Sequence, residues 1–147
     1  MKKIISLSIL LQLVFFTPWA AYANSEIEII NSWIREAPPA VRVSVAYMII
    51  KNNSSAEKKL VSVSSVDFHN IELHQTTNKD GMMHMEEQSE LIIPANNQIE
   101  LKPNSYHLMM MGRKRNLKEG AEVKITLNYA DGNKLNITVP VLKQAPK

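Results

Sequence analysis

The sequence predicts an all-β fold, an antiparallel sandwich or barrel. Turn-forming residues recur at short intervals along the chain, in the segments 38–39, 52–55, 78–81, 94–97, 102–105, 119–120 and 131–133. Between these turns lie runs rich in β-branched residues, and no long stretch shows the periodicity of a helix. Many short strands at regular spacing are typical of packed antiparallel sheets.

The expected strands, in chain order, are residues 43–50, 58–66, 71–75, 82–87, 107–111, 121–130 and 134–142. The last two form the clearest hairpin, because apolar and polar residues alternate on both sides of the turn at 131–133. Its core-facing residues are expected to be Val123, Ile125, Leu127, Leu135, Ile137 and Val139. No internal repeat or linker divides the chain, so we expect a single domain.

Residues 1–23 have the pattern of a secretory signal peptide. Lys2 and Lys3 precede a short apolar run, and the segment ends in the small-x-small sequence of residues 21–23. We therefore expect cleavage before Asn24 and a periplasmic domain of residues 24–147 without stable membrane insertion. An uncleaved anchor is the alternative, although its apolar run is short for a membrane span.

Charge and cysteine content exclude several classes of function. Without Lys2 and Lys3, the 17 basic residues become 15 against 14 acidic ones, a near balance that does not favour nucleic-acid binding. The basic run 113–115 is expected to be a solvated loop, with the steering of an acidic partner protein as the alternative. The chain has no cysteine, so it has no disulfide, no thiolate ligand and no site for cysteine acylation.

Histidine and methionine gather in one third of the chain. All four histidines, and six of the eight methionines, lie between residues 69 and 111; the histidines are His69, His74, His84 and His107. Packing alone does not account for this concentration. Thioether and imidazole ligands together favour Cu(I) over harder divalent ions.

Strand spacing predicts which of these side chains meet. In a strand, residues i and i+2 share a face, so His107, Met109 and Met111 should project together while Leu108 and Met110 point the other way. In the alternative, Met109 and Met111 pack in the core and His107 lies at an edge of the sheet.

A hairpin with arms 71–75 and 82–87 should return Met85 to the neighbourhood of His74. Met83 should share a face with Met85, with Met82 and His84 on the opposite face. His84 is expected to be a surface residue between two buried methionines. Alternative ligands remain Met83, His84, Met110 and Met111.

The spacing of four of these residues resembles the hallmark of the PCuAC periplasmic copper chaperones: His, ten residues, Met, twenty-one residues, then His-x-Met. His74, Met85, His107 and Met109 reproduce it without a gap. The flanking segments SWIREAPP, VAYMIIKN, LKPNSYHLMMMG and LNYADGNKLNITVPV are also similar to the family's blocks, so the likeness spans the whole mature chain.

The resemblance implies a Greek-key sandwich, cupredoxin-like or immunoglobulin-like, that binds Cu(I) through these four residues. It also implies delivery toward the CuA site of cytochrome c oxidase, with subunit II or a Sco-type protein as partner. We expect a monomer, and Cu(II) or Zn as less favoured metals. The chain departs from the family's usual pattern at Asn104-Ser105, where Gly-Gly is common, at Arg113, where Leu is common, and at Gln75-Thr76, which argues against an extra ligand there.

Two other functions compete with this hypothesis. A small exported copper oxidoreductase or a hydrolase is disfavoured, because the chain has no blue-copper cysteine, no Gly-x-Ser-x-Gly and no His-Glu-x-x-His. Glu72 beside His74, and Glu86 beside His84, are interpreted as ordinary surface polarity, so we expect no enzyme. A purely structural periplasmic β-domain would instead use its methionines as core filler and scatter the four motif residues through the interior.

Overall fold

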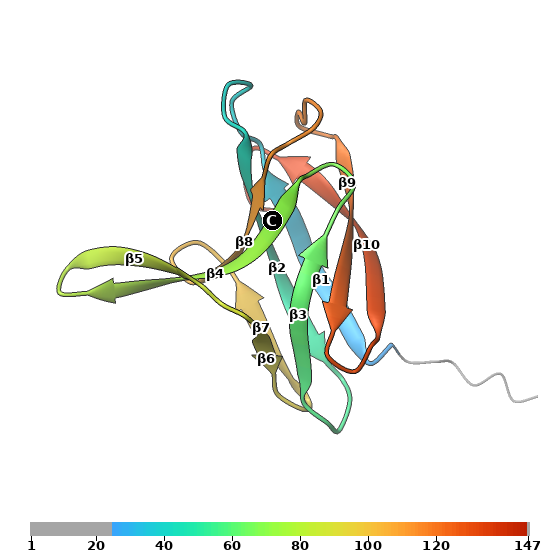
Figure 1. The fold of residues 1–147 in the computed structure, drawn as a ribbon. Coiled ribbons are helices and arrows are strands. Elements are labelled where there is room, and N and C mark those ends of the chain that lie inside the picture. The colour runs from blue at the N-terminus through green and yellow to red at the C-terminus, as the bar shows by residue number, and fades with distance from the viewer. Residues whose placement is uncertain (1–24, 147) are drawn as a thin grey trace, which may run out of the picture.

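The computed structural model describes residues 25–146, and strands make up its regular structure (Figure 1). In this range the strands are β1 Ile27–Arg35, β2 Val43–Asn52, β3 Lys58–Ser64, β4 Asn70–Lys79, β5 Met82–Glu87, β6 Leu91–Ile93, β7 Asn97–Leu101, β8 Tyr106–Met111, β9 Glu122–Tyr129 and β10 Lys134–Leu142. Residues 25–146 contain no helix with the length and apolarity to cross a membrane. The expected signal peptide, residues 1–23, lies outside the described residues.

The strands are arranged as two sheets that pack over a shared core. One sheet has the order β5-β4-β8-β2-β1, with β7 also paired to β2, and the other has the order β10-β9-β3-β6. β1 joins the sheets through a parallel pairing with β10 at Ile34 and Val141, whereas the other pairs within residues 25–146 are antiparallel. The chain passes back and forth between the sheets, so the predicted all-β sandwich is confirmed, with one parallel pair added.

The core forms where the alternating apolar residues of both sheets meet. In the predicted final hairpin, Ile125 of β9 is opposite Ile137 of β10, and Val123, Ile125 and Leu127 are all buried. Val139 is fully buried, while Leu135 and Ile137 pack at the margin of the core. The expected alternation of this hairpin is confirmed.

β1 was not expected as a strand, because its apolar alternation is interrupted. Asn31 has a positive φ of 51°, and the register with β2 shifts between Ile30 and Trp33. Such a bulge inserts an extra residue and breaks the two-residue period on which strand prediction depends. β6 has only three residues and β7 is mostly polar, so neither has a clear pattern.

The loop after β8 differs from the solvated basic loop that was expected. Arg113 is buried, and its guanidinium donates hydrogen bonds to the carbonyl oxygens of Ala37, Pro38 and Pro39 at 3.4, 3.5 and 3.1 Å. Three carbonyl acceptors compensate for the removal of this charge from water. The expectation was therefore wrong for Arg113, although Lys114 remains exposed.

Candidate metal centre

The candidate site lies on the outer face of the sheet formed by β4, β5 and β8. In the register of these strands, His74 is opposite His107, Glu72 is opposite Met109, and Thr76 is opposite Met85. Residues that are directly opposite share a face, as do residues i and i+2. The four motif residues His74, Met85, His107 and Met109 therefore lie on one face.

The inner face of the same strands belongs to the core. Ile71 and Leu73 of β4, and Leu108 and Met110 of β8, are all buried there. The predicted division of the methionine run is confirmed: Met110 is a core residue, and Met109 and Met111 face outward, each half-buried.

Two imidazole rings form the centre of this outer face. The ring centroids of His74 and His107 are 5.9 Å apart, with an angle of 32° between the ring planes. His107 is only 5% exposed, because β8 lies inside the sheet between β4 and β2. The alternative in which His107 sits at an edge is therefore wrong.

Each ring has one nitrogen in contact with an oxygen. His107 Nδ1 is 3.0 Å from the carbonyl oxygen of Ser105, and His74 Nε2 is 2.9 Å from Glu72 Oε2. His74 Nδ1 is buried and has no hydrogen-bond partner. A buried polar atom without a partner is costly and rare in folded proteins, and a metal ion bound there would satisfy it.

Met85 lies farther from the histidines than the expected hairpin implied. The turn uses only Asp80 and Gly81, with positive φ values of 55° and 81°, as in a two-residue hairpin turn. Pairing therefore continues to Lys79 and Met82, and Glu87, not Met85, is directly opposite His74. Met85 is opposite Thr76, which lies two residues beyond His74 on the same face of β4.

Every residue of β5 is exposed. Figure 1 shows that the hairpin of β4 and β5 projects from the sandwich. Met82, Met83 and Met85 are 62%, 55% and 61% exposed. The expectation that His84 lies between buried methionines was therefore wrong, because β5 pairs on one side only and extends beyond the core. The predicted faces are confirmed, with Met83 and Met85 on the histidine side and Met82 and His84 on the other.

Glu72 was interpreted from the sequence as ordinary surface polarity, but its side chain is only 24% exposed and belongs to the site. It contacts His74 and is opposite Met109, and its Oε1 accepts a 2.7 Å hydrogen bond from Asn70 Nδ2. The three residues Asn70, Glu72 and His74 follow the i, i+2, i+4 spacing of one strand face. That spacing was the available signal.

The other histidines and carboxylates do not extend this site. His69 is exposed just before β4, and its backbone N–H donates to the carbonyl oxygen of Met111. Within residues 25–146, no three His, Asp or Glu side chains are grouped closely enough to hold a metal ion.

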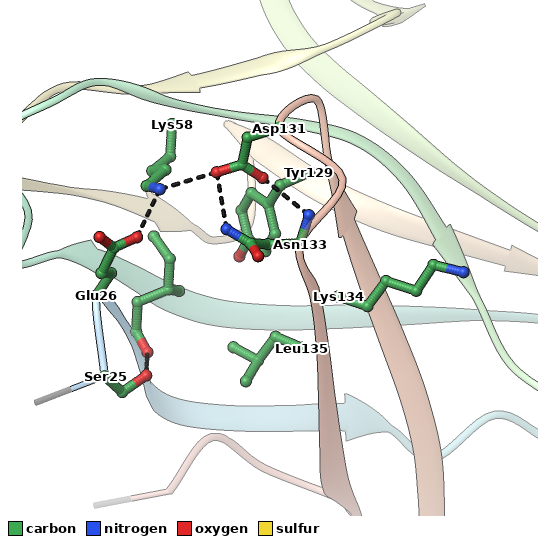
Figure 2. Close-up of a pocket in the computed structure, with 9 residues that line it drawn as sticks. Ser25, Glu26, Lys58, Tyr129, Asp131, Asn133, Lys134 and Leu135 are labelled. Atoms are coloured by element: carbon green, nitrogen blue, oxygen red, sulfur yellow. Dashed lines mark hydrogen bonds and ion pairs between the residues drawn. The ribbon is translucent and has the colours of Figure 1, made fainter. Parts of the chain in front are cut away.

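A separate pocket of about 240 Å³ shares no residue with the histidine face (Figure 2). Its one deep cation, Lys58, is held by Glu26 at 2.6 Å and Asp131 at 2.8 Å, and these hydrogen bonds raise the pKa of Lys58. Burial raises the pKa of Tyr129, so its hydroxyl stays protonated. Because the charges of this pocket already neutralise one another, the histidine face is the better candidate site.

Comparison with known protein families assigns the chain to one of them. A family model described as LpqE-like matches residues 27–141. The chain belongs to the LpqE-like family. One relative, "Putative lipoprotein Lxx21020" of Leifsonia xyli, is 30% identical over 116 residues, which cover 78% of this chain and 69% of the relative.

Solved structures similar to this LpqE-like chain include PCuAC domains. The Cu(I) form of DR1885 from Deinococcus radiodurans is 35% identical, with a TM-score of 0.69, over 84% of this chain and 83% of that one. The copper-bound PCuAC domain of PmoF2 has a TM-score of 0.69 over 85% of this chain and 97% of that one, but at 20% identity it supports the fold alone. The PCuAC resemblance noted in the sequence is confirmed.

Two departures of this LpqE-like chain from the usual PCuAC pattern have structural explanations. Asn104, where glycine is common, has a positive φ of 61°, and asparagine tolerates this left-handed conformation better than most residues. The loop before β8 therefore keeps a conformation suited to glycine. Arg113, where leucine is common, is buried through its three carbonyl contacts.

Proposed function

We propose that this protein is a periplasmic metallochaperone that binds Cu(I) and delivers it toward the CuA site of cytochrome c oxidase. The proposed ligands are His74, Met85, His107 and Met109. The observation that carries the proposal is the pair of imidazole rings 5.9 Å apart on an outer face that also holds both motif methionines. A structural domain that used its methionines as core filler would not collect them on this face.

The donor set suits copper in its reduced state. Thioether sulfur is a soft ligand and imidazole a borderline one, and both are neutral, so they match Cu(I) better than Zn or Cu(II). Thioether sulfur has no proton to exchange, so its binding of copper does not depend on losing one. The buried Nδ1 of His74, which has no hydrogen-bond partner, offers one of the nitrogen donors.

The position of the ligands supports transfer of copper as cargo rather than its retention. His107 is buried, whereas Met85 is 61% exposed on the projecting hairpin. A partner can reach the exposed thioether first and replace the ligands one at a time. The proposed acceptors are subunit II of cytochrome c oxidase or a Sco-type protein, with the chaperone acting as a monomer and not as an enzyme.

Export is supported by the secretory pattern of residues 1–23 and by the lipoprotein description of the Leifsonia xyli relative. An exported protein without cysteine has no thiolate to oxidise, which suits a carrier that works among oxidising proteins. We therefore include the periplasm in the proposal.

The test is an anaerobic Cu(I) titration of residues 24–147 against a competing chelator, with native mass spectrometry for stoichiometry. We expect one Cu(I) per chain, tighter binding of Cu(I) than of Zn, and transfer to a copper-free CuA domain. The double variant M85L/M109L should lose most of its affinity while it keeps its fold, because leucine conserves the volume of methionine. Unchanged affinity in this double variant would refute the ligand assignment.

A further inference from the structure

We propose that Glu72 is a positioning residue that makes Nδ1, rather than Nε2, the copper-binding nitrogen of His74. This inference rests on the proposed function. In the His74 ring, Nε2 contacts a carboxylate oxygen of Glu72 at 2.9 Å, and Nδ1 is buried without a hydrogen-bond partner.

The contact with Glu72 determines which nitrogen has a free lone pair. An ionised carboxylate only accepts hydrogen bonds, so the hydrogen of the neutral imidazole must be on Nε2. Nδ1 then has its lone pair available to a metal. This arrangement of carboxylate, histidine and metal is frequent in metalloproteins, where the carboxylate fixes both the tautomer and the ring orientation.

Glu72 is itself held in place. Its Oε1 accepts a hydrogen bond from Asn70 Nδ2 at 2.7 Å, so each carboxylate oxygen has one polar partner. The Glu72 side chain is 24% exposed, less than that of any other glutamate in an ion pair among residues 25–146. These contacts favour a supporting role over direct binding of copper by Glu72.

The second histidine has the opposite arrangement. His107 Nδ1 is 3.0 Å from the carbonyl oxygen of Ser105, which also only accepts, so the hydrogen is on Nδ1 and the lone pair is on Nε2. The two histidines are therefore prepared to bind one ion through different nitrogens, Nδ1 of His74 and Nε2 of His107. The backbone carbonyl of Ser105 fixes the His107 ring, whereas the side chain of Glu72 fixes the His74 ring. The Glu72 contact can therefore be tested by mutation.

The test is ring ¹⁵N NMR of the protein labelled at histidine, metal-free and loaded with diamagnetic Cu(I). In the metal-free protein we expect a protonated Nε2 and an unprotonated Nδ1 at His74. On loading, the resonance of His74 Nδ1 should shift while Nε2 keeps its hydrogen; for His107 the shift should occur at Nε2. Coordination of His74 through Nε2 would overturn the inference.

The variant E72Q should lower Cu(I) affinity by roughly 10–100-fold, the usual effect of removing such a supporting contact, and should weaken the Nε2–H signal of His74. Its matched control is E87Q, because Glu87 is directly opposite His74 on the same face, and the described structure shows no hydrogen bond between them. E87Q removes the same charge and should leave the ring spectrum unchanged. Equal losses of affinity in both variants would indicate a charge effect and overturn the inference.

The two proposals fail separately in this experiment. If the wild-type protein bound no Cu(I), the proposed function would fall, and with it the assignment of a copper-binding nitrogen. If Cu(I) bound through all four ligands but the metal-free His74 had its hydrogen on Nδ1, the function would stand and the role of Glu72 would fall.

Discussion

His74 and His107 lie directly opposite each other on β4 and β8, with ring centroids 5.9 Å apart on the face that points away from the core. Neighbouring strands bring opposite side chains within reach of one metal ion, so two residues far apart in the sequence can bind the same ion. Substitutions in this pair and in its methionines should therefore affect copper binding, whereas substitutions in the other histidines and methionines nearby should not.

Replacing His74 with alanine should lower Cu(I) affinity by about 100-fold, or about 2.7 kcal/mol, because one of two nitrogen donors is lost. The control is His84→Ala, which removes an exposed imidazole from the opposite face of the same hairpin. Chelator competition under anaerobic conditions measures both. A loss as large in the His84 variant would move the site to the other face.

Met85 and Met82 form a matched pair on β5, because they are 61% and 62% exposed but face opposite ways. Met85→Leu should weaken Cu(I) binding about tenfold, or about 1.4 kcal/mol, whereas Met82→Leu should leave it unchanged. Neither should alter thermal stability, since neither side chain packs in the core. If both variants bound Cu(I) like the wild type, Met85 would not be a ligand.

Adjacent methionines of β8 should separate stability from binding. Met110 is fully buried, so Met110→Ala should lower the free energy of unfolding by about 2–5 kcal/mol through lost packing and the cavity left behind. Met109→Ala should cost less stability, because Met109 is half-buried on the outer face, but should weaken Cu(I) binding. Urea unfolding of the metal-free variants measures their stability, and a separate Cu(I) titration of the folded variants measures binding. The division would be contradicted if Met110→Ala were the weaker binder and the more stable protein.

The ion pair between Asp67 and Arg115 should make stability depend on pH in acid. Arg115 Nε and the terminal nitrogen Nη2 donate to the two carboxylate oxygens at 2.6 and 2.9 Å, and these hydrogen bonds hold the pKa of Asp67 below its ordinary value of 3.8. A lowered pKa means that the charged form is favoured in the folded state. The contribution is therefore complete above the unfolded-state pKa and is lost as the pH falls through the folded-state pKa.

Asp67→Asn should accordingly destabilise the protein by about 1 kcal/mol near neutral pH, a value limited by the exposure of Arg115. The difference from wild type should shrink below roughly pH 4. Chemical unfolding across the acid range measures it, with Arg115→Met and the double variant completing a cycle. A difference that persisted unchanged at pH 2 would show that the carboxylate charge contributes nothing.

The sequence by itself determined the features that depend on local alternation. The β9–β10 hairpin, the core position of Met110 and the outward position of Met109 all follow from the two-residue period of a strand, which neighbours along the chain specify. The spacing of His74, Met85, His107 and Met109 also identified the family, because four histidine and methionine positions at long fixed intervals are unlikely to coincide by chance.

Only the tertiary structure decided how those faces meet. The pairing of His74 with His107 depends on the register between β4 and β8, which is set by packing of their inner faces and not by local sequence. The separate register between β4 and β5, with a turn of only two residues, placed Glu87 opposite His74 and left Met85 exposed. Glu72 became part of the site because its carboxylate turns toward the ring, and Arg113 became buried because three distant carbonyl groups accept its hydrogen bonds. The contacts of Arg113 join segments far apart in the chain, which only folding brings within bonding distance. Glu72 and His74 are near neighbours on one strand face, but the sequence does not specify how their side chains turn toward each other.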